Sequence, residues 1–290
     1  MHPIVTFVLA ALAPEGLAVT PSNPAVPQED LRRIRAAAPA EAPAKPKKPR
    51  KLLVYSRATH YRHESIPWGA QAIRVLGEKT GAYVALLSDD PTMFDRDKLL
   101  EFDAVLFNNN CQNGITTQAR RENLLAFVGG GRGLIGIHSA SHSPDWPEFV
   151  DMLGGFSVNH PWNAGTKVVV KIEEVDHPVA KSFGGRSFII TDEIFQFRDY
   201  SRRKLRVLAS LDTERTDMNK PGIFRTDGDF GLSWVRSYGK GRVFYCEFGH
   251  QRDVYWNPTI LRHYLAGIQF ALGDLQADTT PSAKPVRTHR

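Results

Sequence analysis

The segment 133–140, with the sequence GLIGIHSA, constrains the fold more than any other part of this chain. Its apolar residues Leu134, Ile135 and Ile137 are typical of a buried parallel strand, and the strand ends abruptly at His138. In open α/β sheets, ligands bind just outside the carboxyl ends of the strands. Hydrolases hold a Ser or Cys nucleophile at such a strand-to-turn elbow. The sequence therefore predicts a functional site at His138 that lacks the usual nucleophile.

Strand patterns alternate with helix patterns on both sides of this segment. Short apolar strands are expected at 52–55, 83–87 and 104–107, and helices at 64–79, 116–128 and 147–153. This alternation predicts an α/β fold with a doubly wound, mostly parallel sheet and helices on both faces. The second half adds strands at 167–174 and 206–211, an antiparallel hairpin formed by 232–238 and 242–248 around Gly239-Lys240-Gly241, and a closing helix over 257–272.

Composition limits the partners of this chain. The 290 residues are 42% hydrophobic and 23% charged, as in an ordinary globular protein. The net charge is +6, but 52–273 carries only about +1 of it, which argues against a nucleic-acid partner. Neither Cys111 nor Cys246 lies in a zinc-binding spacing. The apolar run around Cys246 predicts a buried free thiol, and a disulfide between the two cysteines stays open.

The two ends of the chain differ in composition from its middle. Residues 4–13 are apolar, too short to span a bilayer, and typical of the core of a signal peptide, although no Lys or Arg precedes them. We therefore expect a signal peptide over 1–20 and export to the periplasm or beyond, with a cytoplasmic location left open. Residues 21–50, rich in Ala, Pro and Lys, predict a disordered linker, and 274–290 a disordered tail. The folded domain is expected over 51–273, with no transmembrane span.

Several segments together resemble the ThuA-like (trehalose utilisation) family, and they occur in the family's order between 52 and 273. They are 61–66, 129–140, 153–156 with His160-Pro161, 176–179, 191–195 and 234–250. The resemblance implies a class I glutamine amidotransferase-like fold, which is flavodoxin-like, and an association with the catabolism of disaccharides and their keto derivatives. Because His138 stands where the amidotransferases have a cysteine, amidotransferase activity is not expected.

The candidate catalytic residues are histidines and carboxylates. His138 and His250 follow apolar strands, and His63 lies in a family-like segment after the first strand. Imidazole suits acid–base chemistry because it titrates near neutrality. Asp192 and Glu193 form an adjacent carboxylate pair, and only one of them faces the site if the segment is extended.

The candidate substrate-binding residues are Trp234, Arg57, His60 and His160. Trp234 would offer a flat face to a sugar ring, although core packing is the common role of a tryptophan. Arg57, together with His63, would stabilise negative charge on an oxygen. No cofactor is predicted. A divalent metal held by the histidines at 63, 138 and 250 with one carboxylate is the minority alternative.

With the substrate class that the resemblance implies, these residues favour an enzyme that acts on a disaccharide or keto-sugar derivative. Removal of a proton beside a carbonyl, or hydrolytic or eliminative cleavage, would make it a hydrolase, a lyase or an isomerase. A non-catalytic sugar-binding or accessory domain is the second hypothesis, and an adhesion or scaffold module the third. The expected partner is a small carbohydrate. The sequence does not indicate which sugar, or an oligomeric state.

Overall fold

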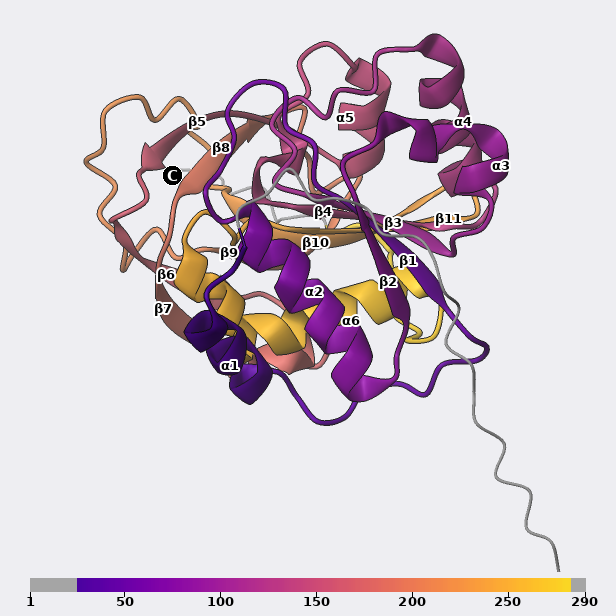
Figure 1. Cartoon of the computed structure of the whole chain (residues 1–290). Coiled ribbons are helices and arrows are strands. Elements are labelled where there is room, and N and C mark those ends of the chain that lie inside the picture. Colours follow the sequence, from indigo (N-terminus) through magenta and orange to yellow (C-terminus); the bar gives the residue numbers. More distant parts are fainter. Residues whose placement is uncertain (1–24, 283–290) are drawn as a thin grey trace, which may run out of the picture.

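A computed structural model describes residues 25–282 of the chain. Within them, nine strands form one mixed sheet in the order β2-β1-β3-β4-β11-β10-β9-β6-β7 (Figure 1). The first five run parallel: β1 Lys51–Tyr55, β2 Val84–Ser88, β3 Ala104–Asn108, β4 Gly133–Ile137 and β11 Gly241–Cys246. The other four extend the sheet in antiparallel fashion: β10 Gly231–Tyr238, β9 Arg206–Leu211, β6 Lys167–Ile172 and β7 Ser187–Thr191. The predicted α/β fold with a large, partly parallel sheet is confirmed.

Helices cover both faces of this sheet. On one face lie α1 Gln28–Ala37, α2 Ile66–Thr80 and α6 Pro258–Leu272, and on the other α3 Arg96–Leu99, α4 Gln118–Gly129 and α5 Pro147–Leu153 (Figure 1). Successive side chains of a strand point to opposite faces. In β1, Leu52 therefore packs in the core under α2 and α6, whereas Leu53 packs in the core under α4 and α5.

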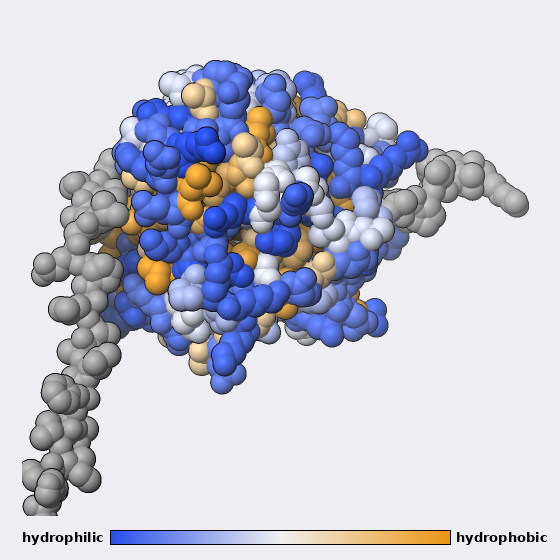
Figure 2. Space-filling model, turned by 90° about the vertical axis from the view of Figure 1, so that its right-hand side faces the viewer, coloured by the Kyte–Doolittle hydropathy of each residue, from blue (hydrophilic) through white to orange (hydrophobic). Residues whose placement is uncertain are grey.

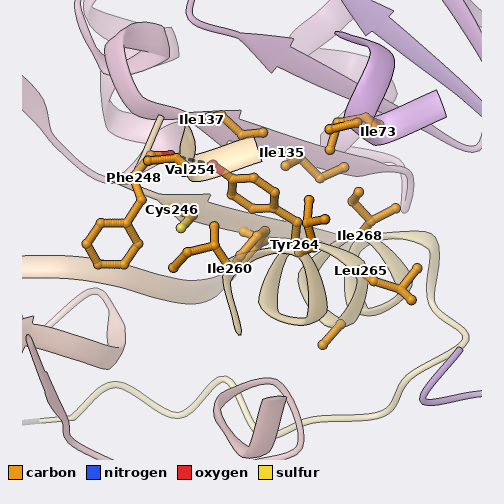
Figure 3. Packing of buried hydrophobic residues seen from close by; sticks show 14 of the residues in the cluster. Ile73, Ile135, Ile137, Cys246, Phe248, Val254, Ile260, Tyr264, Leu265 and Ile268 are labelled. Carbon is orange, nitrogen blue, oxygen red and sulfur yellow. Dashed lines mark hydrogen bonds between the residues drawn. The ribbon is translucent and has the colours of Figure 1, made fainter. Parts of the chain in front are cut away.

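Packing between α6 and the central strands forms the larger core (Figure 3). Ile135 of β4 and Cys246 of β11 lie against Tyr264 and Ile268 of α6, and all four are fully buried. Cys246 is a buried free thiol, as predicted, and burial raises its pKa well above the usual value. Cys111 is also free and buried, so the two cysteines form no disulfide.

Close contact of α6 with β11 requires a glycine at position 267. A Cβ built there would lie 2.1 Å from Cε1 of Phe244. We expect Gly267→Ala to lower the free energy of unfolding by about 1–3 kcal/mol, because overpacking exceeds the gain of about 1 kcal/mol in helix propensity. Gly165→Ala is the control, since its Cβ would meet nothing within 4 Å. Equal denaturation midpoints for the two variants would contradict this account.

His263 of α6 makes stability depend on pH. It is fully buried, hydrogen-bonds to Ser233 and Ser182, and has a pKa lowered to about 3 by burial, with a small contribution from His177. Below about pH 6.5 the unfolded chain gains a proton at this histidine that the folded chain does not. Stability should therefore fall as the pH falls from about 6.5 towards 3.

The contribution of His263 is at most about 1.4 kcal/mol for each pH unit. We expect His263→Gln to remove that part of the slope when the free energy of unfolding is measured between pH 4 and 7. Parallel curves for the wild type and the variant would show that another group causes the dependence.

The segment before β1 is not a disordered linker in its described part, which corrects the prediction for 21–50. Helix α1 packs on α2, with Ile34 fully buried. The following residues have little regular structure but are tied down, since Ala44 exchanges hydrogen bonds with Gln269 and Arg50 pairs with Asp274. A few buried contacts thus order this stretch although its sequence has low hydrophobicity. The predicted signal peptide at 1–20 lies outside the described residues.

The predicted disordered tail also begins as ordered chain. Asp274 bonds to Arg50, and the backbone N–H of Ser282 donates to the carbonyl of Leu205.

Two further strands without a clear sequence signal, β5 Phe156–Trp162 and β8 Ile194–Arg198, form a separate antiparallel pair. The predicted helix over 116–128 begins later, at Gln118, with Thr117 rather than Thr116 before it.

The surface is mainly polar on the side drawn in Figure 2, where hydrophobic residues occur singly or in small groups among hydrophilic ones. Scattered apolar residues of this kind are normal on a folded protein. Among residues 25–282, no helix is both long enough and apolar enough to cross a membrane.

Candidate active site

Three histidines and one glutamate converge beyond the carboxyl ends of the parallel strands. His63 follows β1, His138 follows β4 directly, His250 follows β11, and Glu193 lies between β7 and β8. One nitrogen or carboxylate oxygen from each residue lies within 4.8 Å of those of the other three. We call these four residues the His/Glu cluster. Four of the five predicted catalytic residues thus come together.

His138 occupies a strained position at the elbow between β4 and a short 3-10 turn. Its φ of 50° is in the left-handed region, which is uncommon for a residue other than glycine and costs about 1 kcal/mol or more. The fully buried ring stacks on Phe195, at 4.7 Å between centroids. Nδ1 lies 2.8 Å from the carbonyl oxygen of Glu247 and must donate, because a carbonyl only accepts. In the neutral ring the lone pair is therefore on Nε2, which lies 3.5 Å from Oε1 of Glu193.

Gly249 lets the loop that carries His250 pass close to this elbow. Its φ is 156°, and a Cβ there would lie 2.9 Å from Cγ2 of Ile137 and 3.2 Å from Cβ of His138. A larger residue would push the loop away from the elbow. The tight turn thus brings the ends of β4 and β11 together.

Asp192 fixes the backbone of the loop that carries His250. The carboxylate is fully buried and accepts hydrogen bonds from the backbone N–H groups of Gly249 (2.8 Å) and Gln251 (3.0 Å). Its oxygens are thus used to fix the backbone on both sides of His250. These contacts give Asp192 the position of a residue that fixes the loop, and its catalytic role stays a prediction.

Glu193 is the centre of the cluster. Its Oε1 lies 3.5 Å from Nε2 of His138 and 3.4 Å from Nδ1 of His250, and its Oε2 lies 3.3 Å from Nδ1 of His160. Burial acts to raise its pKa, but the nearby rings of His138 and His250 outweigh burial and lower it. Burial likewise opposes ionisation of His138, yet Glu193 above all raises the pKa of that histidine to about 9.

His63 completes the cluster as a neutral imidazole. Its ring lies edge-on to His138 and His250, with centroids 4.9 Å and 5.0 Å away. Burial, followed by the charges of these two histidines, lowers its pKa to about 2. Nδ1 lies 3.2 Å from Oγ of Ser139, which leaves Nε2 available for another partner.

A buried network behind His138 was not found from the sequence. The hydroxyl of Tyr245 lies 2.5 Å from Oε2 of Glu247 and 2.8 Å from the carbonyl of His138. A single hydroxyl proton cannot serve both oxygens. A protonated Glu247 can donate to Tyr245, which then donates to His138, and burial raises the pKa of Glu247 to about 8. The sequence signal for this network was Glu247 itself, a carboxylate inside the otherwise apolar run 243–248.

The loop after β3 is a second region that the sequence analysis missed. Asn109 has a φ of 54°, and its Nδ2 lies within hydrogen-bond distance of Ser65, the Gly249 carbonyl and Tyr255. It therefore ties the loop after β3 to the loop after β11. Three consecutive asparagines at 108–110, directly after an apolar strand, were the signal.

The predicted substrate-binding residues lie in different places. His160 lies at the cluster, half-exposed. Trp234 is fully buried, donates its indole N–H to the Leu153 carbonyl and stacks on Tyr245, so it packs the core and cannot serve as a sugar platform. His60 stacks loosely on His142 instead of joining the cluster. Arg57 extends beside Gly114 in the neighbouring loop.

A cavity of about 460 Å³ lies beside the cluster, and His250 forms part of its wall. The other residues that line it are Tyr61, Glu64, Gln251, Arg252, Asp253 and Trp256. Tyr61 is 55% exposed, and its ring lies edge-on to His63 at 4.7 Å. An exposed aromatic ring thus lies next to the cluster. Tyr61, and not Trp234, is therefore placed to offer a flat face to a ligand.

Fold and site together define an α/β protein with a histidine–carboxylate centre at the carboxyl edge of a parallel sheet. The trehalose utilisation (ThuA) family matches residues 51–271, and the chain belongs to this family. The predicted resemblance is thereby confirmed.

Solved structures show the same fold. A putative ThuA-like protein from Bacteroides uniformis is 24% identical, with a TM-score of 0.63 over 78% of this chain and 93% of the other. A putative ThuA-like protein from Parabacteroides merdae is 16% identical, with a TM-score of 0.57 over 80% and 93%. Comparison with curated proteins gives no significant match.

Proposed function

We propose that this protein is an enzyme that acts on a disaccharide or keto-sugar derivative, with the His/Glu cluster as its reaction centre. The observation that carries the proposal is the convergence of four buried or nearly buried polar groups, within 4.8 Å of one another, beside a cavity. Burying such groups is costly, and perturbed ionisable groups beside a cavity are typical of active sites. The family's association with trehalose utilisation supports a sugar substrate.

The chemistry we propose is removal of a proton beside a carbonyl, or cleavage of a glycosidic bond by hydrolysis or elimination. A carbonyl acidifies the neighbouring C–H bond, and the buried cluster would stabilise the negative charge that develops on its oxygen. His160 is half-exposed and contacts Glu193, so we assign the exchange of protons with substrate or solvent to His160. No cysteine lies at the elbow, so the reaction we propose is not that of an amidotransferase.

The cavity beside His250 is the proposed sugar site. Tyr61 offers a flat face on which the C–H face of a sugar ring can stack. Glu64 and Arg252, which pair with each other, and Asp253 offer charged partners for hydroxyl groups. A lining of one aromatic ring and several polar groups suits a carbohydrate better than an apolar ligand.

The finer fold class belongs to the same proposal. The parallel strands follow the order β2-β1-β3-β4-β11, which corresponds to the flavodoxin-like order 2-1-3-4-5. This order, with helices on both faces and an added β10–β11 hairpin, supports a class I glutamine amidotransferase-like origin.

We also propose export of the protein, on the basis of the apolar segment 4–13.

A non-catalytic sugar-binding domain is the second candidate, favoured by the absence of a nucleophile at the elbow. Incubating the full chain with disaccharides and their keto derivatives, followed by NMR, separates the two candidates. We expect at least one keto derivative to be converted. A sugar that binds and stays unchanged would favour the binding domain, and a lack of any interaction with sugars would contradict both.

A further inference from the structure

We propose that the His/Glu cluster binds one divalent first-row transition metal ion, with zinc as the reference ion. The proposal rests on the proposed function only for the role of the metal in turnover, and binding itself can be tested alone. Three imidazole nitrogens and one carboxylate oxygen are the donor types that zinc and related ions take. Magnesium and calcium prefer oxygen donors and do not fit this set.

Distances within the cluster fit a four-coordinate ion. Ligands about 2.1 Å from a tetrahedral metal lie about 3.4 Å from one another. Oε1 of Glu193 lies 3.5 Å from Nε2 of His138 and 3.4 Å from Nδ1 of His250. All four donor atoms lie within 4.8 Å, so sub-ångström side-chain shifts would bring the set to bonding geometry.

Unpartnered polar atoms give an independent indication. Within residues 25–282, the buried atoms Nε2 of His138 and Nδ1 of His250 have no hydrogen-bond partner. A buried polar atom without a hydrogen-bond partner costs about 1–3 kcal/mol, and these two nitrogens face the same carboxylate oxygen of Glu193. Both belong to residues whose nearest carboxylate is Glu193. A cation between them would satisfy both nitrogens.

The surroundings hold the histidines as ligands. Nδ1 of His138 donates to the Glu247 carbonyl, so in the neutral ring, the form that binds a metal, the lone pair is on Nε2. Nδ1 of His63 is engaged by Ser139, which leaves its Nε2 available in the same way. Histidine ligands in metal sites are generally oriented by such a second hydrogen bond. Two of the three histidines thus have the second hydrogen bond that is typical of metal ligands.

A bound ion would deepen the proposed function without changing its substrate class. An ion held by these four ligands would have to take a fifth ligand from the cavity, and a sugar carbonyl or hydroxyl bound in that way would be polarised by the ion as a Lewis acid. His160, which contacts Glu193 but is not one of the four ligands, would remain the group that exchanges protons. The four ligands would then hold the ion and would not act as acids or bases.

Metal binding is tested on the full chain after treatment with a chelator. We expect one equivalent of Zn²⁺ to bind in calorimetry, and Co²⁺ to give the visible absorption of a four-coordinate site. Glu193→Gln and His250→Ala should each weaken binding at least about 100-fold. His142→Ala is the matched control, because its Nδ1 is bonded to the Ser157 carbonyl outside the cluster, and its affinity should equal that of the wild type. Circular dichroism would verify that each variant is folded.

Absence of a one-to-one site, or equal affinity in the two cluster variants and the control, would overturn the metal proposal. Full turnover of a sugar by metal-free enzyme would contradict the role of the metal in turnover, and it would leave the proposed function intact. A bound metal without conversion of any sugar would support the site and contradict the proposed function. The two proposals therefore fail in different experiments.

Discussion

Glu193→Gln should reduce turnover of a keto-disaccharide by about 10³-fold while leaving the fold intact. Glu193 is the only carboxylate among the four cluster residues, and its Oε1 faces both His138 and His250. An amide of the same size removes the negative charge that faces these two rings. Losses of 10²–10⁴ are typical when such a group is removed from a reaction centre.

Glu148→Gln on α5 is the matched control, since that side chain is exposed. Its turnover number should equal that of the wild type, and both variants should unfold at the wild-type denaturant concentration within error. If Glu193→Gln retained more than about a tenth of the activity, the cluster would not be the reaction centre. Such a result would leave the sugar-binding candidate as the better account.

Asp192→Ala should destabilise the protein by about 3 kcal/mol and also reduce turnover. The substitution leaves the backbone N–H groups of Gly249 and Gln251 without their buried acceptor. Each unsatisfied group costs about 1–3 kcal/mol, and the loop that carries His250 would loosen. Denaturant unfolding measures the first effect, and steady-state kinetics the second.

Asp192→Asn distinguishes a positioning role from a catalytic one. Its amide oxygen can still accept one of the two hydrogen bonds, so this variant should recover most of the stability and at least a tenth of the turnover. A catalytic acid or base would lose about 10²–10⁴-fold in the Asn and Ala variants alike. Equal and severe losses of turnover in both variants would return Asp192 to the catalytic set.

The sequence predicted the part of the site that strand ends determine. His138 and His250 follow apolar runs that are recognisable as strands, and parallel strands place their carboxyl ends at one edge. His63 and Glu193 came from segments that resemble the family. The directions in which the side chains of Asp192 and Glu193 point depend on a bend between β7 and β8. The alternation of side chains along a strand therefore could not predict which of the two faces the cluster.

The failures have physical causes that a single sequence does not reveal. The sequence did not show whether Trp234 is exposed or buried. It is buried because β10 lies in the interior of the sheet, between β11 and β9. The stretch 21–50 has the composition of a linker, but Ile34 and Arg50 find distant partners on α2 and at Asp274. The role of Glu247 was missed because Phe195, which donates a backbone hydrogen bond to it, is distant in the sequence and is brought to it only by the fold.

A crystal structure of the full chain grown with Co²⁺ and a keto-disaccharide tests the central claim most directly. We predict one anomalous peak about 2.0–2.2 Å from the ligand atoms of His63, His138, Glu193 and His250. The sugar should lie in the cavity beside Tyr61, with an oxygen towards the ion. Co²⁺ bound at another place, or a sugar bound away from the cluster, would contradict the account.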